Sequence, residues 1–509
     1  MWRMSGNPHG NDRPVLRPAD RPTDIAVNLP AAQDPRHPRR QRLQLWHLAL
    51  TYIAWYLLRL PAQWQYDSTQ VYQGAQCLLF WLQGRARTLG DVRGFPLFQY
   101  LSGMAAVWAG EKGIPVNVFW VWSACSALAL VGIVIIFQRA GRRIKQPALS
   151  WVMSVVILGG PLVVYVPKTL NEVVAALLAL AFAGAVTGTG APVACALLFF
   201  LTGITKETAA PMLLVIWIGG LWMRRLPLSR RDRFMHGAAM AAASVLTVGT
   251  NAGFNLVRYR TVWNVHYLAP VYLVNYWPHR LQYCLALWIA PNGGVAMFWP
   301  VLVILAIGLV VLGCRAGRIA PAVIVAIVLG ALTVGLSGWY MPFGWWAWGP
   351  RLMLPWLPAC ALILIKGYPA EAARLVDRAL RNGRAFGVTA TLICFFALPP
   401  VLAVTQPEVV LHFFDTDARF PQDPPEGDSE GHYARSVYLA WRRTPPMLAM
   451  PMLEPLSFAD VALAGGYAVA LVILLAKARE SIVSPHRLVA SATAGQDAPP
   501  ATACFQETA

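Results

Sequence analysis

Apolar runs of bilayer length recur along the chain, separated by segments that carry most of the charged side chains. About 20 apolar residues are enough for an α-helix to span the hydrocarbon core of a bilayer. The pattern predicts an all-α, polytopic integral membrane protein, in which the pair of short helices within 190–223 could instead be re-entrant. We expect twelve transmembrane helices, near residues 43–60, 116–137, 148–166, 170–188, 190–204, 208–223, 236–256, 295–314, 319–337, 351–366, 387–404 and 458–476.

The first segment between predicted spans, residues 61–113, decides the topology. Its apolar part, 95–110, is only about 16 residues long, whereas 116–137 has full length and ends at a basic cluster, 139–145. If both crossed the membrane, that cluster would lie outside, against the positive-inside rule. We therefore expect 71–82 and 95–110 to be helices that lie along the outer surface.

The charge pattern fits this orientation. The formal net charge is +18, from 42 Lys and Arg against 24 Asp and Glu, and the basic residues fall between apolar runs. A nucleic-acid-binding protein would instead gather them on a solvated face, so no nucleic-acid partner is expected. The count of twelve spans predicts a plasma (inner) membrane protein with both termini cytoplasmic, because it places all the later basic clusters inside: 224–233, 315–318, 366–384 and 477–479.

The remaining organisation follows from composition. Residues 1–42 are polar, with no apolar core that could serve as a signal peptide, and are expected to form a disordered cytoplasmic tail. We divide the rest into a transmembrane domain, 43–366, a C-terminal transmembrane part, 367–480, and a cytoplasmic tail, 481–509. The predicted outer loop 405–457 is acidic and is interpreted as a solvated loop, although it could also cap an active site.

Several chemistries lack their sequence signals. The chain has no HExxH motif, no phosphate-binding P-loop, and eight cysteines without a CxxC pair. Gly335-Leu336-Ser337-Gly338 matches the GxSG of intramembrane serine proteases, but such enzymes need a histidine on a later span. The later histidines, His412, His432 and His486, all lie outside the predicted spans. The spans also lack the charges at mid-depth that proton-coupled transporters use.

Four short patterns mark segments that are predicted on the outer face. They are Tyr66-Asp67-Ser68 with Tyr72, then Arg93-Gly94-Phe95-Pro96-Leu97-Phe98-Gln99-Tyr100, then Gly203-Ile204-Thr205-Lys206, and last Trp345-Trp346-Ala347-Trp348-Gly349-Pro350-Arg351 with Leu354-Pro355. In this order they resemble motifs of the polytopic GT-C glycosyltransferases, the superfamily of protein O-mannosyltransferases and aminoarabinose transferases. Phe95 replaces the first proline of the family's surface-helix motif. The resemblance covers residues 43–366 and does not extend to the C-terminal part.

The resemblance implies transfer of a sugar from a polyprenyl-phosphate carrier to the hydroxyl of a glycan, lipid or protein, at the outer face of the cell envelope membrane. Such an enzyme needs a carboxylate to deprotonate the acceptor and cations to stabilise the leaving phosphate. Asp67 is the expected base. Asp91 is a second acid that could orient the acceptor or a divalent metal, although the sequence requires no metal. The expected phosphate ligands are Arg351, Lys206 and Arg93, because Arg can hold phosphate oxygens in a bidentate fork.

Further substrate contacts are expected from Tyr66, Tyr72, His266 and Trp348. Each candidate also has a structural interpretation. Asp67 with Gln70 fits the N-cap of a helix over 68–82. Lys206 and Arg351 could be interfacial anchors, and for most of the tryptophans at 339, 345, 346 and 348 an aromatic belt at the membrane interface is the preferred interpretation.

Two other functions stay open. A non-catalytic lipid or glycan transporter would show internal repeats and helices broken at the bilayer midplane, and the sequence has no clear internal repeat. A scaffold of an envelope-synthesis complex would tolerate neutral residues in place of Asp67 and Arg351.

Overall fold

The computed structural model describes most of the chain between residues 45 and 494. The chain divides into two units, Met1–Leu43 and Gln44–Ala509, and all described residues belong to the second. The predicted tail 1–42 and nearly all of the loop 405–457 lie outside the described residues. These are 45–58, 66–87, 89, 92, 94–114, 118–167, 171–188, 190–224, 229–265, 268, 273–291, 293–339, 343, 349–404 and 457–494.

Each of the twelve predicted spans contains an apolar helix within the described part of the chain. Five helices are long and apolar enough to cross a membrane. They are α4 (Val118–Arg143), α9 (Arg230–Tyr259), α13 (Ala320–Ser337), α16 (Gly383–Ala403) and α20 (Phe458–Ala494). Seven shorter apolar helices account for the other predicted spans: α1 (Leu45–Leu58), α5 (Pro147–Leu158), α6 (Glu172–Val186), α7 (Pro192–Thr205), α8 (Ala209–Met223), α12 (Pro300–Arg315) and α14 (Leu357–Gly367).

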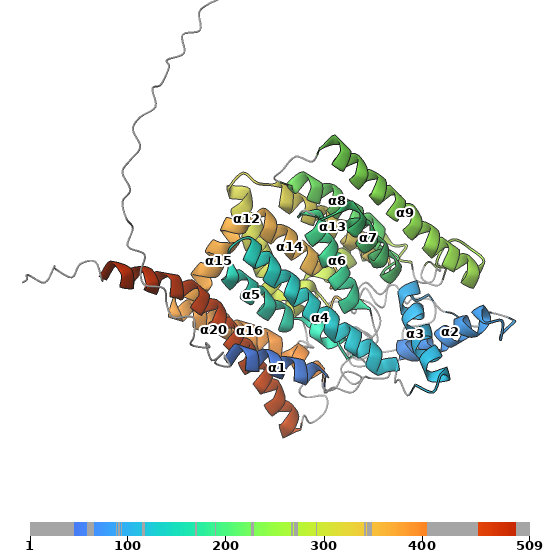
Figure 1. Ribbon diagram of the computed structural model, residues 1–509, viewed down its shortest axis with the longest axis horizontal. Coiled ribbons are helices and arrows are strands. Elements are labelled where there is room, and N and C mark those ends of the chain that lie inside the picture. Colours follow the sequence, from blue (N-terminus) through green and yellow to red (C-terminus); the bar gives the residue numbers. More distant parts are fainter. Residues whose placement is uncertain are drawn as a thin grey trace, which may run out of the picture. The chain divides into compact units, whose positions relative to one another are not determined.

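The two helices predicted within 61–113 are also present. They are α2 (Tyr66–Leu82) and α3 (Leu97–Glu111), which pack against each other. Figure 1 shows them together near one end of α9. The other elements are η1 (Pro161–Tyr165), α10 (Trp277–Ile289), α11 (Val295–Phe298) and α15 (Pro369–Arg381). Among the described residues, extended pairing is limited to one isolated bridge between Leu273 and Trp339, so the fold is all-α as predicted.

Several predicted spans differ from the helices at their ends. The span 148–166 is interrupted, because α5 ends at Leu158 and a 3₁₀-helix follows after Gly159 and Gly160. Pro161 has no N–H to continue the helical hydrogen bonds, and a Cβ on Gly160 would lie 2.5 Å from the Trp299 ring. At the C-terminus, α20 continues to Ala494, well into the segment 481–509 that was interpreted as a tail.

Burial shows where the bundle meets lipid. In α14 every residue from Leu357 to Ile365 is buried, and most of α6 is buried too. The outer helices instead expose large apolar side chains, such as Val245 on α9, Ile304 on α12 and Val334 on α13. A protein surrounded by water rarely exposes so many large apolar side chains. The chain is therefore a polytopic integral membrane protein.

Polar contacts gather at the two ends of α6. At its N-terminal end, Glu172 contacts residues from distant segments. At its C-terminal end, Lys366 donates to the carbonyl of Gly184, and Arg224 donates to the carbonyl of Val186. These cations satisfy carbonyls that have no partner within the helix. A helix of 15 residues is about 22 Å long, so the two polar clusters are well separated.

Candidate functional site

The candidate site is built around Glu172, a fully buried carboxylate in the first turn of α6. Its Oε1 lies 3.0 Å from Nζ of Lys206 and 2.9 Å from Nε of Arg351. The Lys206 and Arg351 side chains are 18% and 11% exposed. Two cations that the sequence proposes as phosphate ligands therefore meet at one carboxylate oxygen. We call these three residues the Glu172 cluster.

Helix ends place the first two members of this cluster. Glu172 begins α6, where a negative side chain is favoured by the helix dipole. Lys206 follows the last residue of α7, and its extended backbone ends that helix before α8 begins at Ala209. The two ends are joined directly, because the side-chain amide of Asn171 donates to the carbonyl of Thr205.

A tight turn before α14 places Arg351. Gly349 has a φ of +68°, and a Cβ there would lie 2.7 Å from the Phe298 ring, so a side chain at this position would be strained on both counts. The amides of Met353 and Leu354 donate to the carbonyl of Pro350, which closes the turn. Leu354, from the same motif, is buried in the main core. Residues 349–354 of this motif thus fix the backbone from which Arg351 reaches Glu172.

The charges of the Glu172 cluster do not cancel. Counted over these three residues alone, two cations and one carboxylate give a formal charge of +1, and within the described part of the chain the second oxygen of Glu172 is buried without a hydrogen-bond partner. Burial lowers the pKa of Lys206 from its ordinary value; the Glu172 carboxylate opposes this shift and the Arg351 charge adds to it. An anionic ligand would relieve the repulsion between the two cations, so the arrangement is suited to binding phosphate.

Of the other predicted site residues, the structure describes the side chain of Tyr72 alone. Tyr66 and Asp67 lie in the first turn of α2, and their side chains are outside the described part. Because α2 begins at Tyr66, Asp67 is within the helix and is not the N-cap expected from the sequence. Tyr72 is half-buried and its hydroxyl is 3.4 Å from Nε2 of Gln76. The remaining candidates lie outside the described residues: Asp91, Arg93, His266 and Trp348.

Sequence reasoning did not assign a role to Glu172. The signal was a single acidic residue at the start of an otherwise uncharged helix of 15 residues. Its partners could not be read from the sequence, because Lys206 and Arg351 are 34 and 179 residues away.

Within the described residues, no group of three or more His, Cys, Asp or Glu side chains is placed to hold a metal ion. The side chains of Asp67 and Asp91 are not among those that the structure describes. Whether Asp91 orients a metal therefore stays a prediction.

Comparison with known proteins gives distant likenesses. No protein-family model matches the sequence, and no curated protein does. Among solved structures, the chain is similar to the crystal structure of ArnT from Cupriavidus metallidurans bound to undecaprenyl phosphate, with a TM-score of 0.47 and 16% identity over 86% of this chain and 77% of that one. The apo state of the same ArnT gives a TM-score of 0.46 and 16% identity, over 87% of this chain and 78% of that one. Both likenesses concern the path of the chain alone, so the chemistry of the site rests on its own residues.

Proposed function

We propose that this chain is a membrane glycosyltransferase of GT-C type. It transfers a sugar from a polyprenyl-phosphate-linked donor to an acceptor hydroxyl, at the outer face of the plasma (inner) membrane. The observation that carries the proposal is the contact of Lys206 and Arg351 with the buried Glu172, because the sequence motifs name both cations as phosphate ligands. A carboxylate that holds two cations in place reduces the cost of ordering them when a phosphate binds.

The distribution of basic residues supports the outer-face assignment. Arg224 and Lys366 lie at the C-terminal end of α6, opposite the Glu172 cluster, and each begins one of the basic clusters, 224–233 and 366–384. By the positive-inside rule, the end with more Lys and Arg faces the cytoplasm. The Glu172 cluster then faces outward, where a polyprenyl-linked sugar would be presented by the outer leaflet.

The proposed reaction is a displacement at the anomeric carbon. Asp67 accepts the proton of the acceptor hydroxyl as its oxygen bonds to that carbon, and the bond between the carbon and the phosphate oxygen breaks with its electron pair. The leaving polyprenyl phosphate gains one negative charge, which the net positive Glu172 cluster stabilises. Arg93 is proposed as a third phosphate ligand, and Asp91 as the acid that orients the acceptor.

Four further residues complete the proposed substrate site. Tyr66 and Tyr72 lie on α2 near Asp67, while His266 and Trp348 belong to two other segments that are predicted outside. An aromatic ring can pack against the apolar face of a sugar, and a phenol or imidazole can hydrogen-bond its hydroxyls.

The test compares cells that lack the gene, complemented with wild type or with Asp67→Asn at matched abundance in the membrane. Envelope glycans and glycolipids are analysed for sugar composition. We expect one sugar to disappear without the gene and to return with wild type alone, because Asn cannot accept the proton. Asp377→Asn on the exposed part of α15 is the matched control and should restore the sugar fully. Restoration by Asp67→Asn would contradict the transferase and favour a transporter or scaffold.

A further inference from the structure

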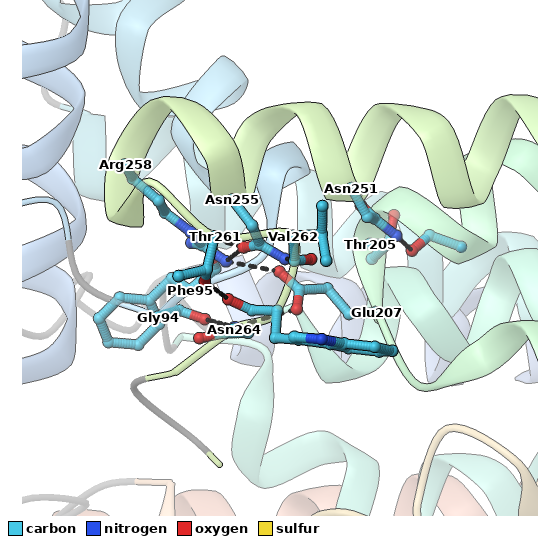
Figure 2. A network of polar contacts seen from close by, with 12 residues as sticks. Gly94, Phe95, Thr205, Glu207, Asn251, Asn255, Arg258, Thr261, Val262 and Asn264 are labelled. Carbon is cyan, nitrogen blue, oxygen red and sulfur yellow. Dashed lines mark hydrogen bonds and ion pairs between the residues drawn. The ribbon is translucent and has the colours of Figure 1, made fainter. Parts of the chain in front are cut away.

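Arg258 is a buried cation near the C-terminal end of α9 that joins three segments of the chain. Its side chain is fully buried. Nη1 donates to the carbonyl of Phe95 at 2.7 Å, and Nη2 donates to Oε1 of Glu207 at 2.8 Å. Nε donates to Oδ1 of Asn255, one turn earlier on α9, at 2.9 Å. Figure 2 shows these side chains converging between α9 and the turn that follows α7.

Asn264 makes a second link between the same segments. Its Nδ2 lies 2.9 Å from the carbonyl of Gly94 and 2.9 Å from Oε2 of Glu207. Each carboxylate oxygen of Glu207 thus accepts a hydrogen bond from a different residue, Oε1 from Arg258 and Oε2 from Asn264. The same two residues also donate to consecutive carbonyls, Arg258 to that of Phe95 and Asn264 to that of Gly94. We call Arg258, Glu207 and Asn264 the clamp.

The segments that the clamp joins each lead to a part of the proposed active site. Glu207 directly follows Lys206 of the Glu172 cluster. Gly94 and Phe95 lead through Pro96 into α3, and α3 packs against α2, the helix that carries Asp67. The turn at Lys206 is itself held by α9, because Nδ2 of Asn251 donates to the carbonyl of Gly203 at 3.1 Å.

The helices α2 and α3 have a small hydrophobic core of their own, separate from the main core. Among the buried members that the structure describes, two come from the rest of the bundle, Trp122 of α4 and Phe254 of α9. The Arg258 guanidinium lies over the Phe254 ring at 4.4 Å from its centroid. The clamp therefore sits beside the apolar contact through which α2 and α3 join α9.

Energetics favour a positioning role for these residues. Removing an arginine and most of a carboxylate from water is unfavourable, and only well-directed hydrogen bonds offset this cost. Apolar residues of similar size would stabilise such a position as well, but they would not fix the distance between specific backbone groups. The clamp fixes the carbonyls of Gly94 and Phe95 relative to Glu207.

We propose that the clamp positions α2 and α3, and with them Asp67, against the Lys206 turn, so that Arg258 and Asn264 are positioning residues for sugar transfer. This inference rests on the proposed function. A displacement of about 1 Å between a base and the group that it serves can lower a rate about 100-fold. Loss of the clamp should therefore lower kcat, while the KM for the polyprenyl-linked donor stays the same, because the Glu172 cluster remains.

Two variants of the full-length protein test this. Arg258→Lys keeps the charge and loses the fork that reaches Phe95 and Glu207 together. Asn264→Ala removes the link to Gly94 and leaves the Arg258–Glu207 ion pair, so it stays informative if Arg258→Lys folds poorly. Arg318→Lys is the matched control, because Arg318 is ion-paired with Glu371 in a different part of the structure.

Hydrogen exchange of the proteins in lipid nanodiscs is the first measurement. We expect peptides of α2 and α3 to exchange at least tenfold faster in both clamp variants, with peptides of α12 and α13 unchanged. The second measurement is transfer of the sugar identified by complementation, for which we expect kcat to fall at least tenfold at constant donor KM. Arg318→Lys should change neither result.

The outcomes separate this inference from the proposed function. Wild-type exchange in α2 and α3 of both variants, or wild-type kcat, would overturn the positioning role. A rise in donor KM at constant kcat would also overturn it, because that pattern belongs to a phosphate ligand. Absence of transfer in the wild type would overturn the proposed function and the role of the clamp in that reaction, while the exchange rates would still decide whether the clamp holds α2 and α3.

Discussion

Lys206 and Arg351 contact the same oxygen of Glu172, one from the turn after α7 and the other from the turn before α14. The two cations share that oxygen, while the second oxygen of Glu172 has no hydrogen-bond partner among the described residues. The cluster thus holds more positive than negative charge in a buried position. A ligand that brings negative charge to this point should both bind there and stabilise the fold.

Arg351→Lys should weaken donor binding more than it lowers the rate of the bound complex. Lysine keeps the charge but cannot hold Glu172 and a phosphate oxygen in one rigid fork. We expect the Kd for a polyprenyl phosphate to rise about 10-fold, corresponding to about 1.4 kcal/mol. Binding is measured with purified protein in nanodiscs. Arg374→Lys, at an exposed position on α15, is the control, and equal affinity of Arg351→Lys and wild type would contradict the phosphate role.

Glu172→Gln should destabilise the folded protein, and binding of polyprenyl phosphate should restore part of the lost stability. Removing the carboxylate takes away the charge that Lys206 and Arg351 both contact, and breaking a buried ion pair in this way costs about 3–5 kcal/mol. A bound phosphate can supply that counter-charge. The rise in melting temperature on adding polyprenyl phosphate should therefore be larger in Glu172→Gln than in wild type.

Glu371→Gln is the matched control for this experiment. Glu371 is another buried carboxylate, ion-paired with Arg318 and Arg374 and not with the Glu172 cluster. We expect it to lower the melting temperature without increasing the effect of polyprenyl phosphate. An equal rise in melting temperature in both variants on adding polyprenyl phosphate would show that the lipid stabilises the bundle in general and does not bind at Glu172.

The twelve helices could be predicted from the sequence because a bilayer leaves few alternatives for an apolar run of that length. Their ends were less predictable. Hydropathy does not register the break after Leu158, which depends on Pro161 and on the packing of Trp299 against Gly160. It also missed the continuation of α20 to Ala494, because helical structure does not require an apolar sequence.

The site was predicted in part. Lys206 and Arg351 were named from local motifs, and the structure brings them together, but it does so through Glu172, which no motif contains. The clamp was missed for the same reason, since Arg258 contacts Phe95 across 163 residues. Contacts between residues so far apart in the sequence depend on how the helices pack, and short sequence motifs do not encode this packing. The roles of all the named site residues stay predictions, those of Lys206 and Arg351 as phosphate ligands included.

Stability at acidic pH should depend on Glu371 of α15. Burial by itself would raise the pKa of this carboxyl, but a backbone hydrogen bond and its pairing with Arg318 and Arg374 hold the pKa below its ordinary value of 4.5. A carboxyl with a lowered pKa in the folded state adds stability above the pKa of the unfolded chain, and loses it as the pH falls through the folded-state pKa. The melting temperature of wild type should thus fall below pH 4.5 more steeply than that of Glu371→Gln. Parallel curves for the two proteins would contradict this role.

Gly313→Ala should destabilise the bundle through Tyr368. A Cβ at Gly313 of α12 would lie 2.3 Å from the Tyr368 ring, which is fully buried. The ring is held in place because its hydroxyl donates to the carbonyl of Arg318 and accepts from the amide of Ala322. Moving the ring strains both hydrogen bonds, so we expect a loss of about 1–3 kcal/mol in the free energy of unfolding.

Gly330→Ala on the neighbouring α13 separates this packing effect from the general effect of replacing glycine in a helix. A Cβ at Gly330 would meet no atom within 4 Å, so the substitution should be neutral or stabilise by roughly 0.5–1 kcal/mol. The free energy of unfolding of both variants is measured in mixed micelles under the same conditions. If Gly313→Ala is as stable as Gly330→Ala, the contact between α12 and Tyr368 is loose enough to admit a methyl group. If only Gly313→Ala is destabilised, Tyr368 is a fixed point between α12, α13 and α15, and the basic end of the bundle is held by packing as well as by the Arg318–Glu371 ion pair.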